Sequence, residues 1–243
     1  MYIFISLKFK IFNIKLINLE LIQINLNILG TGNVAQEIGT KLIQLGHEVN
    51  IGTRNPKNEN ALNWAKKNGS KASVGTFAEA AKFGERIFNC VHGINAIEAI
   101  TSAGPEKFKD KILIDITNPY NYKDGHISLD PKYSGNTCLG EEIQKLLPNA
   151  KVVKTLNYLG SNMMTNPSSL AEPITGFYCG NDDKAKEIVN QILHDFGWTD
   201  TLDIGNISMS RYTEMLGAFW VPLYGKLGNM NWGFRLVHEP KKK

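Results

Sequence analysis

The chain has 243 residues, of which 42% are hydrophobic and 21% are charged. This composition is typical of a globular protein and excludes a disordered chain, a coiled coil and a collagen-like polymer. The formal charge of +4 comes mostly from the C-terminal lysines, Lys241 to Lys243, so the sequence predicts no nucleic-acid-binding face.

Residues 1–23 form an N-terminal extension whose composition differs from the rest of the chain. Lys8, Lys10 and Lys15 interrupt its apolar residues, and it has no small-residue cleavage site of the kind that signal peptides carry. Its longest uncharged run is too short for a membrane helix, so no membrane span is predicted. Two interpretations stay open: residues 1–22 are a wrongly assigned start, or they are a genuine strand-like or partner-binding arm.

From residue 24 onward, strands and helices alternate. The apolar pattern predicts strands at 24–29, 48–52, 72–74, 86–91 and 112–116, and helices at 34–45, 60–68, 76–82 and 95–101. Gly46 is placed to end the first helix. This order requires a parallel sheet with right-handed crossovers. The predicted fold class is therefore α/β, a doubly wound parallel sheet of the Rossmann type.

The second half of the chain is less regular. Residues 120–138 are rich in Asn, Asp, Gly and Tyr and predict a loop. A last apolar helix should be kinked by its proline, Pro222. Before it, the pattern predicts a helix at 141–147, strands at 152–156 and 177–179, and a helix at 183–196 with Asp182 and Gly197 as caps.

A glycine motif lies between the first strand and its helix. Gly30-Thr31-Gly32-Asn33-Val34-Ala35 matches GxGxxA, a variant of the dinucleotide fingerprint. Gly30 permits the tight turn, Gly32 lets the backbone approach a pyrophosphate, and Ala35 permits close helix packing. The free N–H groups at the start of the helix would then face the phosphates.

The end of the second strand indicates which dinucleotide is bound. NAD enzymes place an acidic residue there for the ribose hydroxyls, but this chain reads Thr53-Arg54-Asn55-Pro56. Arg54 is a planar cationic donor suited to a 2′-phosphate, and Thr53 can add a hydroxyl contact. NADP(H) is therefore the expected cofactor.

The nicotinamide is expected over the carboxyl ends of the fourth and fifth strands, which read Val91-His92-Gly93 and Thr117-Asn118-Pro119. His92 is the histidine predicted at a strand end and the one weak catalytic candidate. It could bond the nicotinamide amide, donate to a substrate, or only bond a loop carbonyl.

Three segments carry a specific family resemblance. They are ILGTGNVAQEIGTKLIQLGHEVNIGTRNP (28–56), DITNP (115–119) and EEIQKLLPNAKVVKTLN (141–157). Together they resemble the NADP-dependent oxidoreductase family named for coenzyme F420, an 8-hydroxy-5-deazaflavin. The NADPH-binding domains of the six-transmembrane metalloreductases are similar. The resemblance runs from about Ile24 to at least Asp203 and implies the Rossmann fold and NADP.

The resemblance also implies which residues hold the cofactor: the first-turn glycines, the Thr–Arg pair and the backbone at the next strand ends. In this chain these are Gly30, Thr31, Gly32, Asn33, Val34, Thr53, Arg54, Val91, His92, Asn118 and Pro119. We accordingly expect an NADP-binding Rossmann domain over residues 24–160. Residues 161–243 are expected to form a C-terminal extension that completes the substrate pocket.

The chain departs from the family in two places. The deazaflavin enzymes resemble each other in a small proline-containing motif after the fourth strand, where this chain has Val91-His92-Gly93. Its C-terminal region is also rich in aromatic residues, which could line a flat-ring pocket, form a homodimer interface, or serve as plain core or surface anchors. These are Phe219, Trp220, Tyr224, Trp232 and Phe234.

The expected function is hydride transfer between NADP(H) and a flat redox cofactor such as a deazaflavin or flavin. Such a transfer needs alignment of two rings and no protein acid or base, which fits the lack of a clear catalytic dyad. Two alternatives stay open. One is an NADPH-sensing module without turnover. The other is a dehydrogenase or imine reductase of a small metabolite, for which Lys154 and Lys226 are proton-transfer candidates if they are not ordinary surface lysines.

The cysteines bear on the compartment. Cys90, Cys138 and Cys179 are sparse and lack CxxC spacing, which indicates neither a disulfide framework nor a zinc site. No metal is predicted, and the reducing cytoplasm is the expected location. The expected partner is a small-molecule redox cofactor, and a homodimer is a further expectation.

Overall fold

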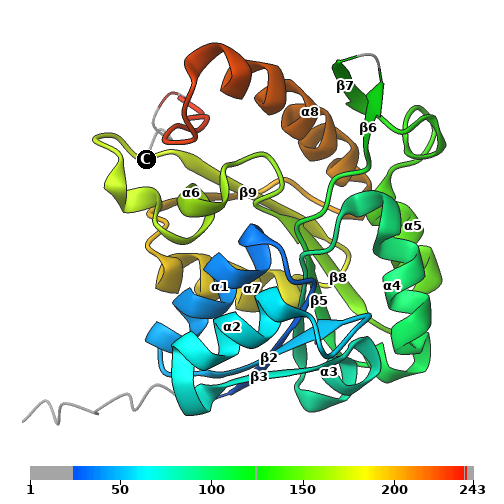
Figure 1. Ribbon diagram of the computed structural model, residues 1–243. Coiled ribbons are helices and arrows are strands. Elements are labelled where there is room, and N and C mark those ends of the chain that lie inside the picture. Colours follow the sequence, from blue (N-terminus) through cyan, green and yellow to red (C-terminus); the bar gives the residue numbers. More distant parts are fainter. Residues whose placement is uncertain (1–23, 124, 238, 240–243) are drawn as a thin grey trace, which may run out of the picture.

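An eight-stranded sheet forms the centre of the protein (Figure 1). The computed structural model describes residues 24–123, 125–237 and 239. The expected N-terminal extension, residues 1–23, lies outside the described residues. The strand order is β3–β2–β1–β4–β5–β8–β9–β10. The strands are β1 (Asn25–Leu29), β2 (Glu48–Thr53), β3 (Ala72–Thr76), β4 (Arg86–Asn89), β5 (Ile112–Asp115), β8 (Lys151–Thr155), β9 (Thr175–Gly180) and β10 (Asp200–Asp203).

The six strands from β3 to β8 are parallel, which confirms the predicted doubly wound α/β fold. At the far edge the direction reverses: β9 runs antiparallel to β8, and β10 runs parallel to β9. β10 was not predicted, since DTLD has only one apolar residue and half of it is exposed.

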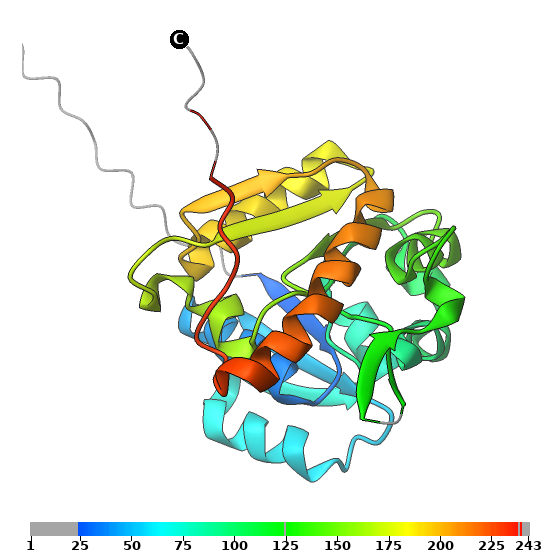
Figure 2. The ribbon, with the colours of Figure 1, turned by 90° about the horizontal axis from the view of Figure 1, so that it is seen from above.

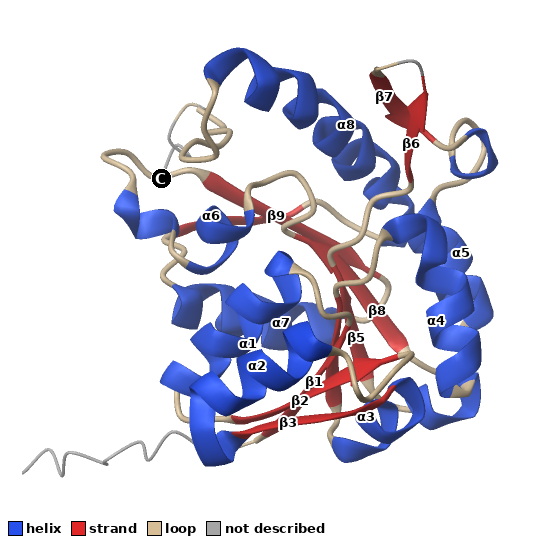
Figure 3. Ribbon diagram, in the orientation of Figure 1, coloured by secondary structure: helices blue, strands red, loops and turns tan. Residues whose placement is uncertain are grey.

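Helices cover both faces of the sheet, and each face has its own apolar core (Figure 3). One face carries α1 (Asn33–Gln44), α2 (Glu59–Asn68) and α7 (Asp183–Phe196); the other carries α3 (Phe77–Phe83), α4 (Ala96–Ala103) and α5 (Leu139–Leu146). The short α6 (Ser161–Thr165) packs against α1. Buried strands that are apolar on both sides explain why the sequence shows continuous apolar runs rather than alternation.

The predicted helix signals operate as expected. Gly46 has a φ of +98° just after α1. Asp182 accepts the Ala185 N–H at 2.8 Å at the start of α7, and Gly197 ends that helix with a φ of +104°. These local contacts set where each helix begins and ends.

The prediction of a loop over residues 120–138 is wrong for its first half. Its first half is a hairpin of β6 (Tyr120–Lys123) and β7 (His126–Leu129), and Gly125 turns the chain between them with a φ of +75°. None of these strand residues is buried and half of them are exposed, so their pairing leaves little apolar pattern.

The last helix, α8 (Ser210–Leu227), continues through Pro222 and lies across the carboxyl end of the sheet, beside the hairpin (Figure 2). It brings residues from the expected C-terminal extension over the strand ends of the first half of the chain. Among the described helices, none has the length and apolar character needed to cross a membrane.

Candidate functional site

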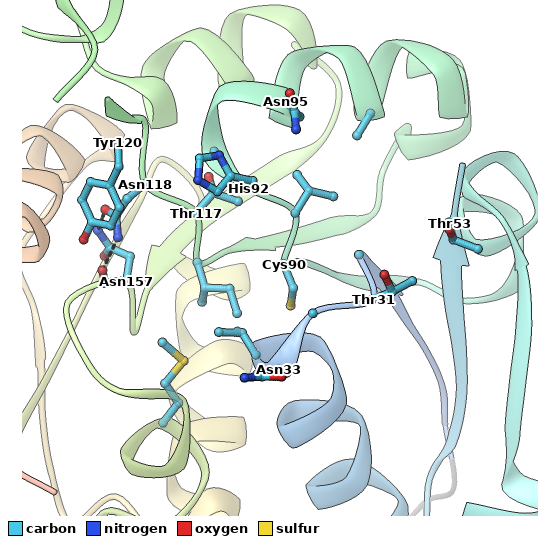
Figure 4. Close-up of a pocket in the computed structure, with 18 of the residues that line it drawn as sticks. Thr31, Asn33, Thr53, Cys90, His92, Asn95, Thr117, Asn118, Tyr120 and Asn157 are labelled. Carbon is cyan, nitrogen blue, oxygen red and sulfur yellow. Dashed lines mark hydrogen bonds between the residues drawn. The ribbon is translucent and has the colours of Figure 1, made fainter. Parts of the chain in front are cut away.

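A cavity of about 980 Å³ opens at the carboxyl ends of β1, β4 and β5. The crossovers leave β1 and β4 in opposite directions, and ligands of doubly wound sheets bind in the crevice that forms there. Every predicted cofactor residue except Pro119 lines this cavity. Figure 4 shows it extending from Thr53, past Thr31 and Cys90, to Tyr120 and Asn157.

The glycine turn forms the floor of the cavity. Gly30 has a φ of +117°, and a Cβ there would lie 2.7 Å from the Cys90 carbonyl oxygen. A Cβ on Gly32 would meet nothing within 4 Å, so the backbone there is open for a ligand. Helix α1 begins at Asn33 with no acidic residue in its first turn, which leaves its N–H groups available to an anion. The turn therefore fits a pyrophosphate.

The end of β2 forms one end of the cavity. The Arg54 side chain is exposed and lines the opening. Thr53 is buried, and its Oγ1 accepts the Asn55 N–H at 3.2 Å, so its own proton remains available to a ligand. This pair fits a phosphate on the adenosine ribose.

The ends of β4 and β5 touch each other. A Cβ on Gly93 would overlap the Asn118 carbonyl oxygen, so only glycine allows this approach. His92 is exposed at the cavity wall, while the buried Pro119 uses its carbonyl to accept the Asp130 N–H at 2.7 Å. Pro119 thus lies behind the wall, and the role of Gly93 was missed from sequence.

Aromatic side chains form the wall opposite the glycine turn. Trp220 and Tyr224 of α8 stack with ring centroids 5.5 Å apart and planes 3° apart, and Trp220 also stacks on Trp232 at 5.3 Å. Tyr120 and Tyr122 of the hairpin complete the wall. Of the five aromatic residues singled out from sequence, Trp220 and Tyr224 line the cavity; Phe219 is exposed and stacks on Phe234.

An amide pair lies at the same end (Figure 4). Asn157 Nδ2 donates to Asn118 Oδ1 at 2.8 Å, and Asn118 Nδ2 donates back to the Asn157 carbonyl. Burial raises the pKa of Tyr120, whose hydroxyl lies by Asn118, so the phenol stays neutral. Burial and Asp115 likewise raise the pKa of the Cys90 thiol, which makes it a poor nucleophile.

Lys154 is not a surface lysine. It is fully buried, and its Nζ lies 2.7 Å from Asp115 Oδ2, 3.1 Å from Glu214 Oε1 and 2.6 Å from the Thr117 carbonyl oxygen. Burial lowers the pKa of Lys154, but attraction by Asp115 and Glu214 raises it by a larger amount. The net pKa is raised, so the ammonium stays charged. Neither Lys154 nor Lys226 lines the cavity.

The cavity offers no paired acid and base. Among the described residues that line it, no histidine, carboxylate or lysine is hydrogen-bonded to a second acid–base group. Nor does the described part of the chain contain a cluster of three or more His, Cys, Asp or Glu side chains that could hold a metal ion.

Comparison with known proteins identifies the family. Residues 25–119 match the model described as NADP oxidoreductase, coenzyme F420-dependent. The crystal structure of a proposed F420-dependent NADP-reductase from Arthrobacter sp. FB24 superposes with a TM-score of 0.83 at 36% identity, covering 88% of this chain and 100% of that chain. The chain belongs to the coenzyme F420-dependent NADP oxidoreductase family. The expected family and enzyme class, an NADP-dependent oxidoreductase, are thereby confirmed.

Two curated relatives are more distant in sequence, and the chain matches only part of each. Metalloreductase STEAP3 of Rattus norvegicus is 28% identical over 196 residues, which are 80% of this chain and 36% of that protein. F420-dependent NADP reductase of Methanocaldococcus jannaschii is 24% identical over 135 residues, 55% of this chain and 59% of that protein. The matched region thus spans less than two thirds of either curated relative.

Proposed function

We propose that the protein binds NADPH along the cavity and directs its hydride to a flat redox ring, a deazaflavin or flavin. The adenosine 2′-phosphate would contact Arg54 and Thr53, and the pyrophosphate would contact the backbone from Gly30 to Val34. The nicotinamide would then lie near Val91, His92 and Asn118. When bound, NADPH supplies the two electrons and the hydrogen, and the protein supplies alignment and exclusion of water.

One observation carries this proposal: a single cavity joins the glycine turn to a wall of stacked aromatic rings. Its volume lies at the upper end of the range for ligand pockets, about 300–1,000 Å³. The lining at the wall end consists of aromatic, apolar and amide side chains without a lysine or arginine. That environment favours an uncharged flat ring over an acidic metabolite.

The lack of an acid–base pair supports the same choice. Reduction of a carbonyl or imine needs a proton donor positioned at the reacting atom. His92 and the neutral phenol of Tyr120 line the cavity, but neither is hydrogen-bonded to a second acid or base among the described residues. Ring-to-ring hydride transfer needs only that the two rings are stacked at the right separation. The likeness to the Arthrobacter protein and to the F420-dependent NADP reductase supports a deazaflavin as the ring.

NADPH oxidation by the pure protein with a panel of acceptors tests the proposal. The panel contains 8-hydroxy-5-deazariboflavin, FMN, FAD, ferric chelates, quinones and small ketones. We expect turnover with a flat ring. Turnover confined to ketones or imines would make the protein a small-molecule reductase, and tight NADPH binding with no turnover would make it a sensor. The three free cysteines fit a reducing compartment such as the cytoplasm for this reaction.

A further inference from the structure

The aromatic wall is attached to the sheet by a buried charge network. Glu214, on the second turn of α8, pairs with Lys154 of β8, which in turn holds Asp115 and the Thr117 carbonyl at the end of β5. Glu214 also accepts the N–H groups of Leu139 and Gly140 at 3.1 and 3.0 Å, at the start of α5. One carboxylate therefore connects α8 to α5 and, through Lys154, to β8 and β5.

One turn further along α8, the helix backbone contacts the β5 end without a side chain between them. A Cβ on Gly217 would lie 2.6 Å from Tyr120 Oη, 2.8 Å from the Asn157 carbonyl oxygen and 3.0 Å from Asn118 Nδ2. Asn118 and Tyr120 line the cavity. The distance between α8 and the β5 end therefore depends on the lack of a side chain at Gly217 as well as on the charge network.

Glu214, Gly217, Val221 and Tyr224 follow each other at intervals of three or four residues, so they share one side of α8. Glu214 contacts β8 through Lys154, Gly217 contacts the residues that follow β5 and β8, and the last two line the cavity. Trp220 and Val221 lie one turn beyond Gly217 and before Pro222, so a shift of the helix at Glu214 or Gly217 would displace this part of the cavity wall.

We propose that Glu214 and Lys154 are positioning residues that, with Gly217, set the width of the cavity between the aromatic wall and the β5 end. This rests on the proposed function, in which the acceptor ring enters that gap. The dinucleotide half of the cavity, near Arg54 and Gly32, lies on other elements and is independent of the spacing. Changes in the network therefore act on the acceptor and the nicotinamide environment, and leave the proposed contacts to the 2′-phosphate and the pyrophosphate of NADPH in place.

Two variants disturb the distance between α8 and the β5 end in different ways. Glu214→Gln keeps the shape and an acceptor oxygen but removes the charge that holds Lys154. Gly217→Ala keeps the charges but inserts a methyl group into the contact, and alanine favours a helix interior over glycine, so α8 itself is preserved. If both changes have the same effect on the acceptor site, the cause is the altered distance between α8 and the β5 end and not a general loss of stability.

Each variant has a matched control. Glu141→Gln disturbs the bidentate pair with Arg211, at 2.7 and 2.8 Å, which also joins α5 to α8 but has no part in the contacts of Lys154. Gly225→Ala places a methyl group on the same helix where nothing lies within 4 Å. We expect both controls to behave as the wild type.

The test measures NADPH binding through nicotinamide fluorescence, and steady-state kinetics with 8-hydroxy-5-deazariboflavin. In Glu214→Gln and Gly217→Ala, we expect the Kd for NADPH to stay within about twofold of wild type, because the distant contacts are independent. The emission of the bound nicotinamide should change, and KM for the deazaflavin should rise about tenfold or more, since misplacement of about 1 Å is costly.

Wild-type emission and wild-type KM in both variants would overturn the proposal. Changes of emission and KM of the same size in the two control variants would also overturn it. A parallel loss of NADPH affinity and melting temperature would also overturn it, because it would show a merely structural role. If the wild type reduces no flat ring, the hydride-transfer proposal fails, while the emission of bound NADPH still decides whether these residues position α8.

Discussion

At the scale of single residues, we predict that Arg54 determines the preference for NADPH over NADH. A hydrogen bond to a charged group contributes about 1.5–3 kcal/mol, so Arg54→Ala should weaken NADPH binding by roughly ten- to a hundredfold. NADH, which lacks the 2′-phosphate, should bind the variant and the wild type alike. Lys57→Ala is the control, since Lys57 is an exposed cation of the same loop that does not line the cavity. Calorimetric titration with both nucleotides measures this, and equal losses for NADPH and NADH would assign Arg54 a structural role.

The two glycines of the fingerprint have separable roles. Gly30→Ala is strained by the positive φ and by the Cys90 carbonyl, so it should lower the melting temperature, with a destabilisation of about 1–3 kcal/mol. Gly32→Ala has free space for its methyl group in the unbound protein. It should melt as the wild type and yet lose NADPH binding, because the methyl group occupies the place of the pyrophosphate. Thermal melts with and without NADPH distinguish them, and a Gly32→Ala variant that binds NADPH normally would contradict the predicted pyrophosphate position.

Residues that act within a short stretch of chain could be predicted from the sequence. The glycine turn and the Thr53–Arg54 pair belong to local motifs, and the structure brings both to one cavity. The Asp115–Lys154 pair could not be found that way, since its members lie 39 residues apart and meet only through the pairing of β5 with β8. A charged residue inside an apolar strand, as in ILID and VVKT, is the signal that predicts such a buried partner.

At the scale of elements, the buried helices and strands were predictable, whereas the exposed ones were not. Apolar periodicity identified α1, α7 and the central strands, because burial forces that pattern on them. The β6–β7 hairpin and β10 were not predicted, since none of their residues is buried. The reversed direction of β9 also left no trace in its sequence, because a buried strand is apolar in either direction.

The attachment of α8 predicts a dependence of stability on pH. Burial raises the pKa of Glu214 above its ordinary value of 4.5, although Lys154 and the amides of α5 oppose the shift. The folded state therefore binds this proton more tightly than the unfolded state. Its stabilising contribution is complete below pH 4.5 and is lost as the pH rises through the folded pKa.

Glu214→Gln removes this titration, so the wild type should lose stability relative to the variant as the pH rises above 4.5 and through the raised pKa of Glu214. Asp115 is present in both proteins, and Cys138 and Tyr120, which also face Glu214, have raised pKa values and stay neutral. Urea unfolding at stepped pH values measures the difference. Parallel pH profiles would show that Glu214 does not titrate in this range.

At the scale of the whole molecule, the cavity joins parts that are far apart in the sequence. The glycine turn lies near the start of the described chain, and the aromatic wall lies near its end. The family resemblance predicted the first of these, but the use of α8 as a wall depends on how the last helix crosses the sheet. A homodimer stays a prediction, which sedimentation of the pure protein would test.

Deuterium transfer is the measurement that tests the central claim most directly. NADPH labelled with deuterium on one face of the nicotinamide is mixed with the protein and 8-hydroxy-5-deazariboflavin, whose ring carbon retains the transferred hydrogen. We predict deuterium in the reduced ring, with Ala in place of His92 slowing the transfer by less than about tenfold, because alignment dominates. Deuterium found only in a small carbonyl product, with a loss of about 10²–10⁴ in the His92→Ala variant, would contradict ring-to-ring transfer.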